Sequence, residues 1–65
     1  MTEEETENKI YNALSAMPIP VVLGRGEIIS DFRAFARAAA QDIGKGSPKL
    51  RALAEAGLKR LNIQL

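Results

Sequence analysis

The chain has 65 residues, which suffices for one domain over residues 1–65 but leaves little room for a deep cavity beside a core. It contains no cysteine and no histidine, which removes disulfides, thiolate metal sites and the commonest general base. Hydrophobic residues make up 46% of the chain, so wholesale disorder is not expected. We therefore expect a small binding domain that is not an enzyme and holds no cofactor or metal.

Charge is unevenly distributed along the chain. Residues 1–16 carry four glutamates and one lysine, whereas residues 17–65 carry four acids and eight bases. This asymmetry predicts a basic surface away from the N-terminus and, if nucleic acid is the partner, modest and salt-sensitive affinity. The acidic start has the wrong sign for a secretory signal, and no apolar run approaches the roughly 20 residues that span a bilayer. We expect a cytoplasmic protein with no membrane contact.

A first helix is predicted over residues 3–16. Thr2 can cap it, with Glu5 three positions on as a capping box requires. The early glutamates suit the positive end of the helix dipole. An apolar stripe recurs at helical spacing, formed by Ile10, Leu14 and Met17 with Tyr11 at its border. Pro18 and Pro20 should end this helix.

The residues that follow are predicted to form an ordered loop and then a second helix. Residues 18–26 are apolar and rich in Pro and Gly, and a strand there would have no evident partner; Gly24 and Gly26 would allow a turn. A second helix is expected over residues 28–43, with Ser30 as a local cap in its first turn and Gly44 as a left-handed stop. Its predicted buried stripe comprises Ile28, Phe32, Phe35, Ala36, Ala39 and Ile43.

A third helix is predicted over residues 48–61, with Ser47 as its cap and Pro48 at its first position. Its apolar face should comprise Leu50, Leu53, Ala54, Gly57, Leu58 and Leu61, and the apolar residues of the tail, Ile63 and Leu65, should pack back. The predicted fold is all-α, a small bundle of three main helices. An ordered Pro/Gly loop joins the first two, and a turn of helix-hairpin-helix type joins the last two.

That second turn, Gly44-Lys45-Gly46-Ser47, is the most informative motif. A Gly-x-Gly turn before a helix can present several backbone amides to one anion, and Lys45 and the Ser47 hydroxyl would add to such a site. A simpler interpretation explains the same residues, because Gly44 can end one helix while Ser47 and Pro48 begin the next. Both interpretations stay open at this point.

The segment Ile43-Gly-Lys-Gly-Ser47, followed by Leu-Ala-Glu-Ala-Gly-Leu at 53–58, resembles the C-terminal domain of the bacterial RNA polymerase alpha subunit. That family reads Leu-Gly-Lys-Lys-Ser at the turn, and its first helix carries Arg-x-x-Asn-x-Leu. Residues 9–14 of this chain, Lys-Ile-Tyr-Asn-Ala-Leu, stand in a similar place. The resemblance implies a domain that contacts the minor groove of A·T-rich DNA and also touches transcription proteins.

Carried over residue by residue, Asn12, Gly44, Lys45 and Ser47 match the family pattern. Lys9 replaces the arginine and loses its planar fork. Gly46 stands where the family has a second lysine, and Leu50 stands where it has a glutamate. The resemblance therefore implies a DNA-binding site at Lys9, Asn12 and the turn formed by residues 44–47.

Two further arginines are candidate phosphate contacts. Arg33 and Arg37 lie one turn apart on a helix face, with Arg25 nearby in sequence, although such pairs more often form an ordinary solvated face. Phe32 and Phe35 are expected to be packing residues and not a base-stacking platform. Asp31 and Asp42 are too far apart along one helix to share a proton or a metal.

Two functions follow as hypotheses. The first is a DNA-binding or RNA-polymerase-associated transcription module that acts through residues Lys9, Asn12, Arg33, Arg37 and 44–47. The second is a protein-interaction module without nucleic acid contact, such as a phage or plasmid inhibitor, an antitoxin or a docking domain. A wide apolar third helix also makes a homodimer one of the expected forms.

Overall fold

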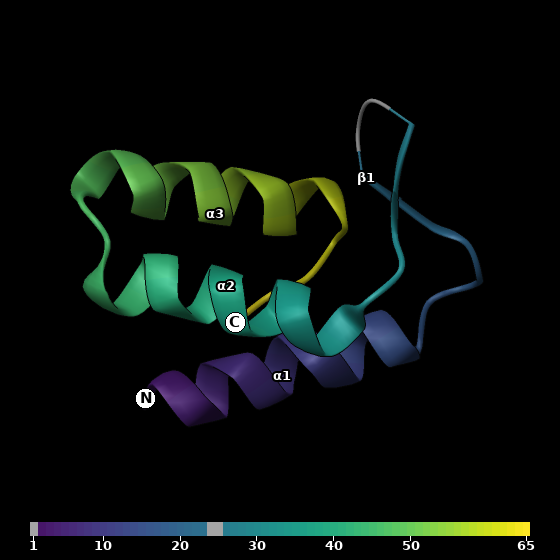
Figure 1. Ribbon diagram of the computed structural model, residues 1–65, viewed down its shortest axis with the longest axis horizontal. Coiled ribbons are helices and arrows are strands. Elements are labelled where there is room, and N and C mark those ends of the chain that lie inside the picture. The colour runs from purple at the N-terminus through teal and green to yellow at the C-terminus, as the bar shows by residue number, and fades with distance from the viewer. Residues whose placement is uncertain (1, 24–25) are drawn as a thin grey trace.

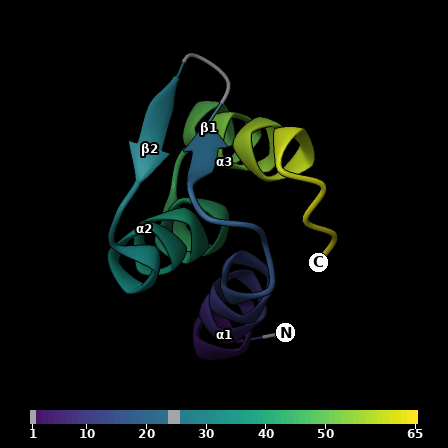
Figure 2. The ribbon, with the colours of Figure 1, turned by 90° about the vertical axis from the view of Figure 1, so that its right-hand side faces the viewer.

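The computed structural model describes residues 2–23 and 26–65, with the backbone alone at Lys45. Helix α2 is central, because α1 packs on one side of it and α3 on another (Figure 1). A two-stranded antiparallel hairpin stands at one end of the helices (Figure 2). The element bounds are α1 Glu3–Ser15, β1 Val21–Leu23, β2 Glu27–Ile29, α2 Phe32–Lys45 and α3 Pro48–Arg60.

Helix α1 forms where its capping box and apolar stripe predict it. The Thr2 hydroxyl accepts a hydrogen bond from the Glu5 backbone N–H at 3.1 Å, which satisfies one of the free donors of the first turn. Ile10 and Leu14 are completely buried against the rest of the molecule. The helix ends at Ser15, one residue before its predicted end, so both the element and its cap are confirmed.

The segment after α1 is not the strand-free loop that the sequence predicts. Val21–Leu23 pairs antiparallel with Glu27–Ile29, with Val22 opposite Ile28. Gly26 has φ +84°, a left-handed conformation that other residues adopt only with strain, and it helps the chain reverse. The prediction failed because Ile28 and Ile29 were assigned to the second helix. As β-branched residues next to a turn, they also suit a strand.

Helix α2 therefore begins at Phe32 and not at residue 28. Asp31 is its cap, since its carboxylate accepts a hydrogen bond from the Ala34 backbone N–H at 3.0 Å, so the predicted capping role of Ser30 is wrong. Ile28, which was expected on the buried stripe of this helix, is 64% exposed on β2. Further along, Ala36 and Ala40 are buried as expected for the α1-facing side of α2.

The far end of α2 also differs from expectation. The helix continues through Gly44 to Lys45, and Gly46 caps it in an extended conformation with φ −70°. Gly44 is therefore a helical residue and not a left-handed stop. Ser47 caps α3 as predicted, because its hydroxyl accepts a hydrogen bond from the Leu50 backbone N–H at 3.3 Å.

Helix α3 buries less of its apolar face than its sequence predicts. Leu58 is buried, but Leu50 is 43% and Leu53 61% exposed. Beyond its C-terminus, Asn62 adopts φ +60° and the Ile63 N–H donates to the Leu58 carbonyl at 2.9 Å, which turns the chain back. Ile63 is buried as expected, whereas Leu65 stays exposed.

Candidate functional site

The predicted anion-binding turn uses its backbone donors within the protein. The Gly46 N–H donates to the Asp42 carbonyl at 3.2 Å, and the Leu50 N–H donates to the Ser47 hydroxyl. Pro48 has no N–H at all. In a helix-hairpin-helix site, the amides of such a turn would point at a phosphate. Here the Gly46 and Leu50 amides are instead hydrogen-bonded within the chain, where they end α2 and begin α3.

The structure does not bring Lys9 and Asn12 to this turn. Both are exposed on α1, and Asn12 is two positions from the buried Ile10, about 200° around the helix and so on the face turned away from α2. Helices α1 and α2 run antiparallel (Figure 1). Glu7 of α1 and Arg37 of α2 are in contact and mark the same level along the two helices. Asn12 lies five residues from Glu7 toward one end of the helices, and Gly44 lies seven residues from Arg37 toward the other end. At 1.5 Å per residue this places them about 18 Å apart along the helix axes.

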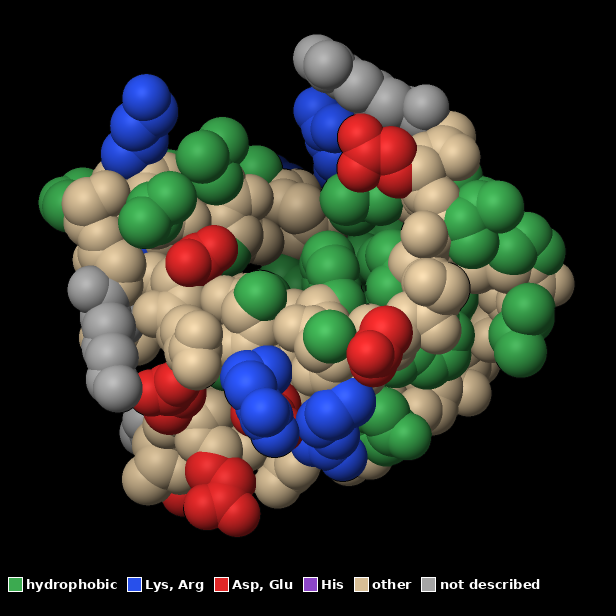
Figure 3. Space-filling view, viewed as in Figure 1, with side chains coloured by type: hydrophobic (Ala, Val, Ile, Leu, Met, Phe, Trp, Pro, Cys, Tyr) green, Lys and Arg blue, Asp and Glu red, His purple; other side chains and the backbone are tan. Residues whose placement is uncertain are grey.

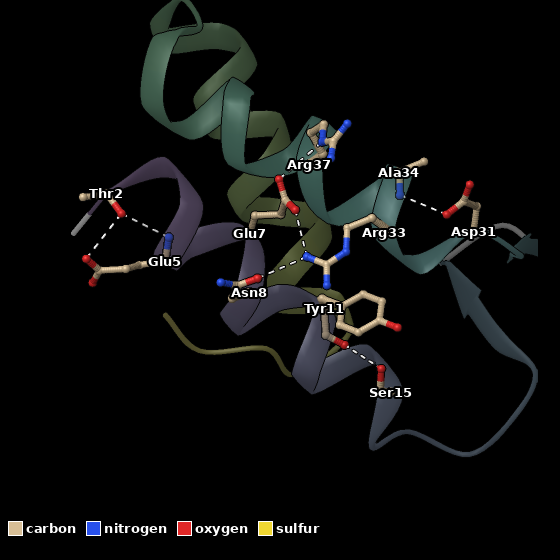
Figure 4. A network of polar contacts seen from close by, with 10 residues as sticks. All are labelled: Thr2, Glu5, Glu7, Asn8, Tyr11, Ser15, Asp31, Arg33, Ala34 and Arg37. Atoms are coloured by element: carbon tan, nitrogen blue, oxygen red, sulfur yellow. Dashed lines mark hydrogen bonds and ion pairs between the residues drawn. The ribbon is translucent and has the colours of Figure 1, made fainter.

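Arg33 and Arg37 point toward α1 and contact one carboxylate there (Figure 4). The Arg33 Nη1 donates to Glu7 Oε2 at 2.8 Å, and the Arg37 Nε donates to Glu7 Oε1 at 3.4 Å. The same Arg33 nitrogen donates to Asn8 Oδ1 at 3.1 Å. We call Glu7, Arg33 and Arg37 the α1–α2 clasp. Predicted as a phosphate-facing strip, these arginines instead join two helices; Arg25, the third member of that prediction, lies outside the described residues.

The clasp is completed by an aromatic ring. The Arg33 guanidinium carbon lies 3.9 Å from the centroid of the Tyr11 ring, which is a cation–π geometry. The hydrogen bond from Arg33 is the main cause that lowers the pKa of Glu7 below its ordinary value of 4.5; partial desolvation opposes this effect, and the charge of Arg37 adds to it. The two ion pairs of the clasp therefore stabilise the α1–α2 packing only while Glu7 is ionised.

This linkage predicts a specific acid sensitivity. Because the pKa of Glu7 is lower in the folded than in the unfolded chain, the stabilisation is present above pH 4.5 and is lost as the pH falls through the folded value. We expect Glu7→Gln to lower the melting temperature at neutral pH and to flatten its decline in acid, both followed by circular dichroism. Glu4→Gln, which removes an exposed carboxylate from the same helix, is the control and should retain the decline. Equal acid profiles for Glu7→Gln and the unmodified chain would refute the linkage.

A surface that the sequence did not predict lies between α2 and α3. Two hollows of about 180 and 320 Å³ meet there and share Leu23, Leu53 and Gly57. In Figure 3 an apolar hollow opens toward the viewer between the helices and the hairpin. We call this surface the α2–α3 groove. Its lining comprises Leu23, Phe35, Ala39, Asp42, Leu53, Ala54, Ala56, Gly57 and Arg60.

The walls of the groove follow from the fold. Helix α3 contributes the exposed Leu53 and the small Gly57, α2 contributes the half-buried Phe35, and β1 closes one end with Leu23. Leu23 points inward because its neighbour Val22 points outward, as alternation along a strand requires. Sequence reasoning placed Leu53 on a wide apolar face of the third helix and gave a homodimer as one of the expected forms. It missed the groove itself, because residues of α2, α3 and β1 that are distant in sequence line it together.

A larger hollow, of about 470 Å³, lies elsewhere, between the end of α1, the segment 18–22 and the turn after α3. Its size falls within the range of small-molecule sites. Its lining contains no ionisable side chain, and Asn62 supplies its only side-chain amide. It therefore offers none of the groups that general acid–base or nucleophilic chemistry requires.

Within residues 2–23 and 26–65, acidic side chains nowhere gather in the groups of three that could hold a metal ion. In the same part of the chain, every helix is too short or too polar to cross a bilayer. Comparison of the chain with protein-family models, curated protein sequences and solved structures finds no match.

Proposed function

We propose that this chain is a non-catalytic protein-interaction module that receives apolar side chains of a partner in the α2–α3 groove. The observation that carries the proposal is Leu53, a large apolar side chain that is 61% exposed beside an apolar hollow. Apolar surface with a few polar groups at its edges is typical of the centre of protein interfaces. Side chains of a partner would remove this surface from water, which is the main driving force for such association.

The positions of the predicted DNA-contacting residues favour this function over the transcription module that the resemblance implies. Asn12 and the turn at residues 44–47 lie about 18 Å apart along the helix axes, so they do not converge on one contact as the resemblance requires. Arg33 and Arg37 are engaged with Glu7, and contact with a phosphate would cost those ion pairs. A protein partner in the groove requires no such rearrangement.

A two-probe titration tests the proposal. The first probe is a peptide selected from a random library against the unmodified protein, and the second is a short A·T-rich DNA duplex at low salt. We expect the peptide to shift the backbone amide signals of Phe35, Leu53 and Gly57, and the duplex to shift none at residues 9–12 or 44–47. Leu53→Glu should lower the affinity for the selected peptide at least about tenfold, because it places a charge in the apolar contact.

Either of two results would overturn the proposal. One is a library that yields no peptide whose binding maps to the groove. The other is a duplex titration that shifts residues 9–12 and 44–47 together, which would favour the DNA-binding module. Circular dichroism of Leu53→Glu provides the folding control, and an unchanged spectrum is expected since Leu53 is mostly exposed.

A further inference from the structure

We propose that the partner in the α2–α3 groove is a second copy of this chain, and that two copies pack face to face about a two-fold axis. The inference rests on the proposed function, because it names the occupant of the same surface. In a two-fold dimer the same patch of both copies must be complementary to itself. Three features of the groove meet this condition.

The first feature is a protruding side chain next to a hollow that can receive it. Leu53 projects from α3, and the hollow beside it continues to Phe35 and Leu23 at the hairpin end. When two α3 helices pack antiparallel, Leu53 of each copy reaches the hairpin end of the other. Each copy then supplies one knob and one hollow, as an interface with two-fold symmetry requires.

The second feature is a small residue at the centre. Gly57 lies about one helical turn from Leu53 and faces the groove, and a Cβ atom built on it would meet no other atom within 4 Å. The neighbouring Ala56 and Ala39 are also small. A two-fold axis at this level would bring the α3 backbones close together, since no large side chain separates them there.

The third feature is opposite charge at the two ends of the groove. Asp42 lines it beside Leu53 and Ala54, whereas Arg60 lines it six to seven residues, about 10 Å, further along α3. The antiparallel arrangement places Arg60 of one copy at the end that holds Asp42 of the other. Two equivalent ion pairs would then form across the interface, and the parallel arrangement, which brings like ends together, would be disfavoured.

The groove also opens on a face of sufficient size. It faces the viewer in Figure 3, along the shortest principal axis, so the surrounding face spans the two longer extents of 29 and 22 Å. A standard interface buries about 800 Å² per partner. That is roughly one sixth of the 4662 Å² accessible surface of this chain.

Sedimentation equilibrium of the full chain provides the first test. From micromolar to millimolar concentration, we expect the average mass to rise from 7.1 kDa toward twice that value. Leu53→Glu should weaken the association at least about tenfold. Asp42→Lys and Arg60→Glu should each weaken it as well, because either change places like charges at both ends of the interface.

A mixing experiment then tests the two-fold geometry itself. When Asp42→Lys and Arg60→Glu proteins are combined, the mixed dimer carries one attractive pair at each end: the two introduced charges at one and the two native charges at the other. We expect the mixture to associate more strongly than either variant alone. A general effect of net charge would predict attraction too, so Lys59→Glu, which changes the net charge equally but keeps Arg60, is the matched control. Lys59→Glu should associate with itself as the unmodified chain does. Its heterodimer with Asp42→Lys keeps the introduced lysine opposite Arg60 at one end, and it should form more weakly than the heterodimer of Asp42→Lys with Arg60→Glu.

Two outcomes would overturn the inference: a mass of 7.1 kDa at every concentration, or equal affinity of the two heterodimers with Asp42→Lys, one formed with Arg60→Glu and the other with Lys59→Glu. Circular dichroism of each variant shows whether a loss of association reflects misfolding. The proposed function is judged separately, because a strictly monomeric chain whose groove binds the library peptide would retain that function and lose only the dimer.

Discussion

Replacing Leu14 by alanine is expected to lower the free energy of unfolding by about 2–5 kcal/mol, which is the usual cost of deleting a fully buried leucine side chain. Leu14 is 0% exposed and belongs to the cluster that joins α1 to α2 and α3. The substitution removes three buried carbon atoms and leaves a cavity. Because a domain of 65 residues has little stability to spare, most molecules of this variant should be unfolded at physiological temperature.

Leu53→Ala is the matched control, since it makes the same chemical change at a leucine that is 61% exposed. We expect it to alter the free energy of unfolding of the monomer by less than about 0.5 kcal/mol. Both variants are compared with the unmodified chain by urea titration at the lowest concentration that the signal permits, because self-association would make apparent stability depend on concentration. Similar losses for the two leucines would contradict the core described above.

Gly46→Ala is expected to lower the free energy of unfolding by about 1–3 kcal/mol, because there is no space for the added methyl group. A Cβ at this position would lie 2.5 Å from the Asp42 carbonyl oxygen and 3.0 Å from the Leu50 Cβ. The carbonyl also accepts the hydrogen bond that ends α2, so the chain must shift at the point where α2 meets α3. The glycine is thus required for close approach, although its φ of −70° is accessible to any residue.

Gly44→Ala, two residues earlier, should raise the free energy of unfolding, whereas Gly46→Ala lowers it. Gly44 lies inside α2, and a Cβ there would meet no atom within 4 Å. Alanine loses less backbone entropy than glycine on entering a helix, so we expect a gain of up to about 1 kcal/mol. Thermal melts of both variants measure the contrast. If Gly44→Ala destabilised the protein as strongly as Gly46→Ala does, the helical conformation of Gly44 would be contradicted. The left-handed conformation that its sequence context predicts would then be favoured.

The contrast between the two glycines bears on function as well. The resemblance to the polymerase alpha domain depends on a Gly-x-Gly turn whose amides face outward. In the structure, one glycine continues a helix and the other closes it against its own carbonyl. The turn thus serves to cap helices, as the simpler interpretation held for Ser47 and Pro48, although Gly46 and not Gly44 ends α2. The α2–α3 groove becomes the surface on which a function is proposed.

Local features of this protein followed from the sequence. The positions of α1 and α3, the caps at Thr2 and Ser47, and the apolar stripe that places Ile10 and Leu14 on one face of α1 all depend on residues within about one helical turn of one another. Capping motifs and helical periodicity report such short-range preferences directly, because the interacting groups are neighbours along the chain.

Features that join distant residues were decided only by the tertiary structure. Arg33 and Arg37 contact Glu7, which lies 26 and 30 residues away in the sequence. No sequence pattern near either arginine indicates this partner. Ile28 becomes a strand residue because Val22 pairs with it, although helix and strand both fit an apolar run this short. The exposure of Leu53 is of the same kind: periodicity shows that this leucine lies on the apolar side of α3, but how much of that side remains in contact with water is decided by the packing of the whole molecule.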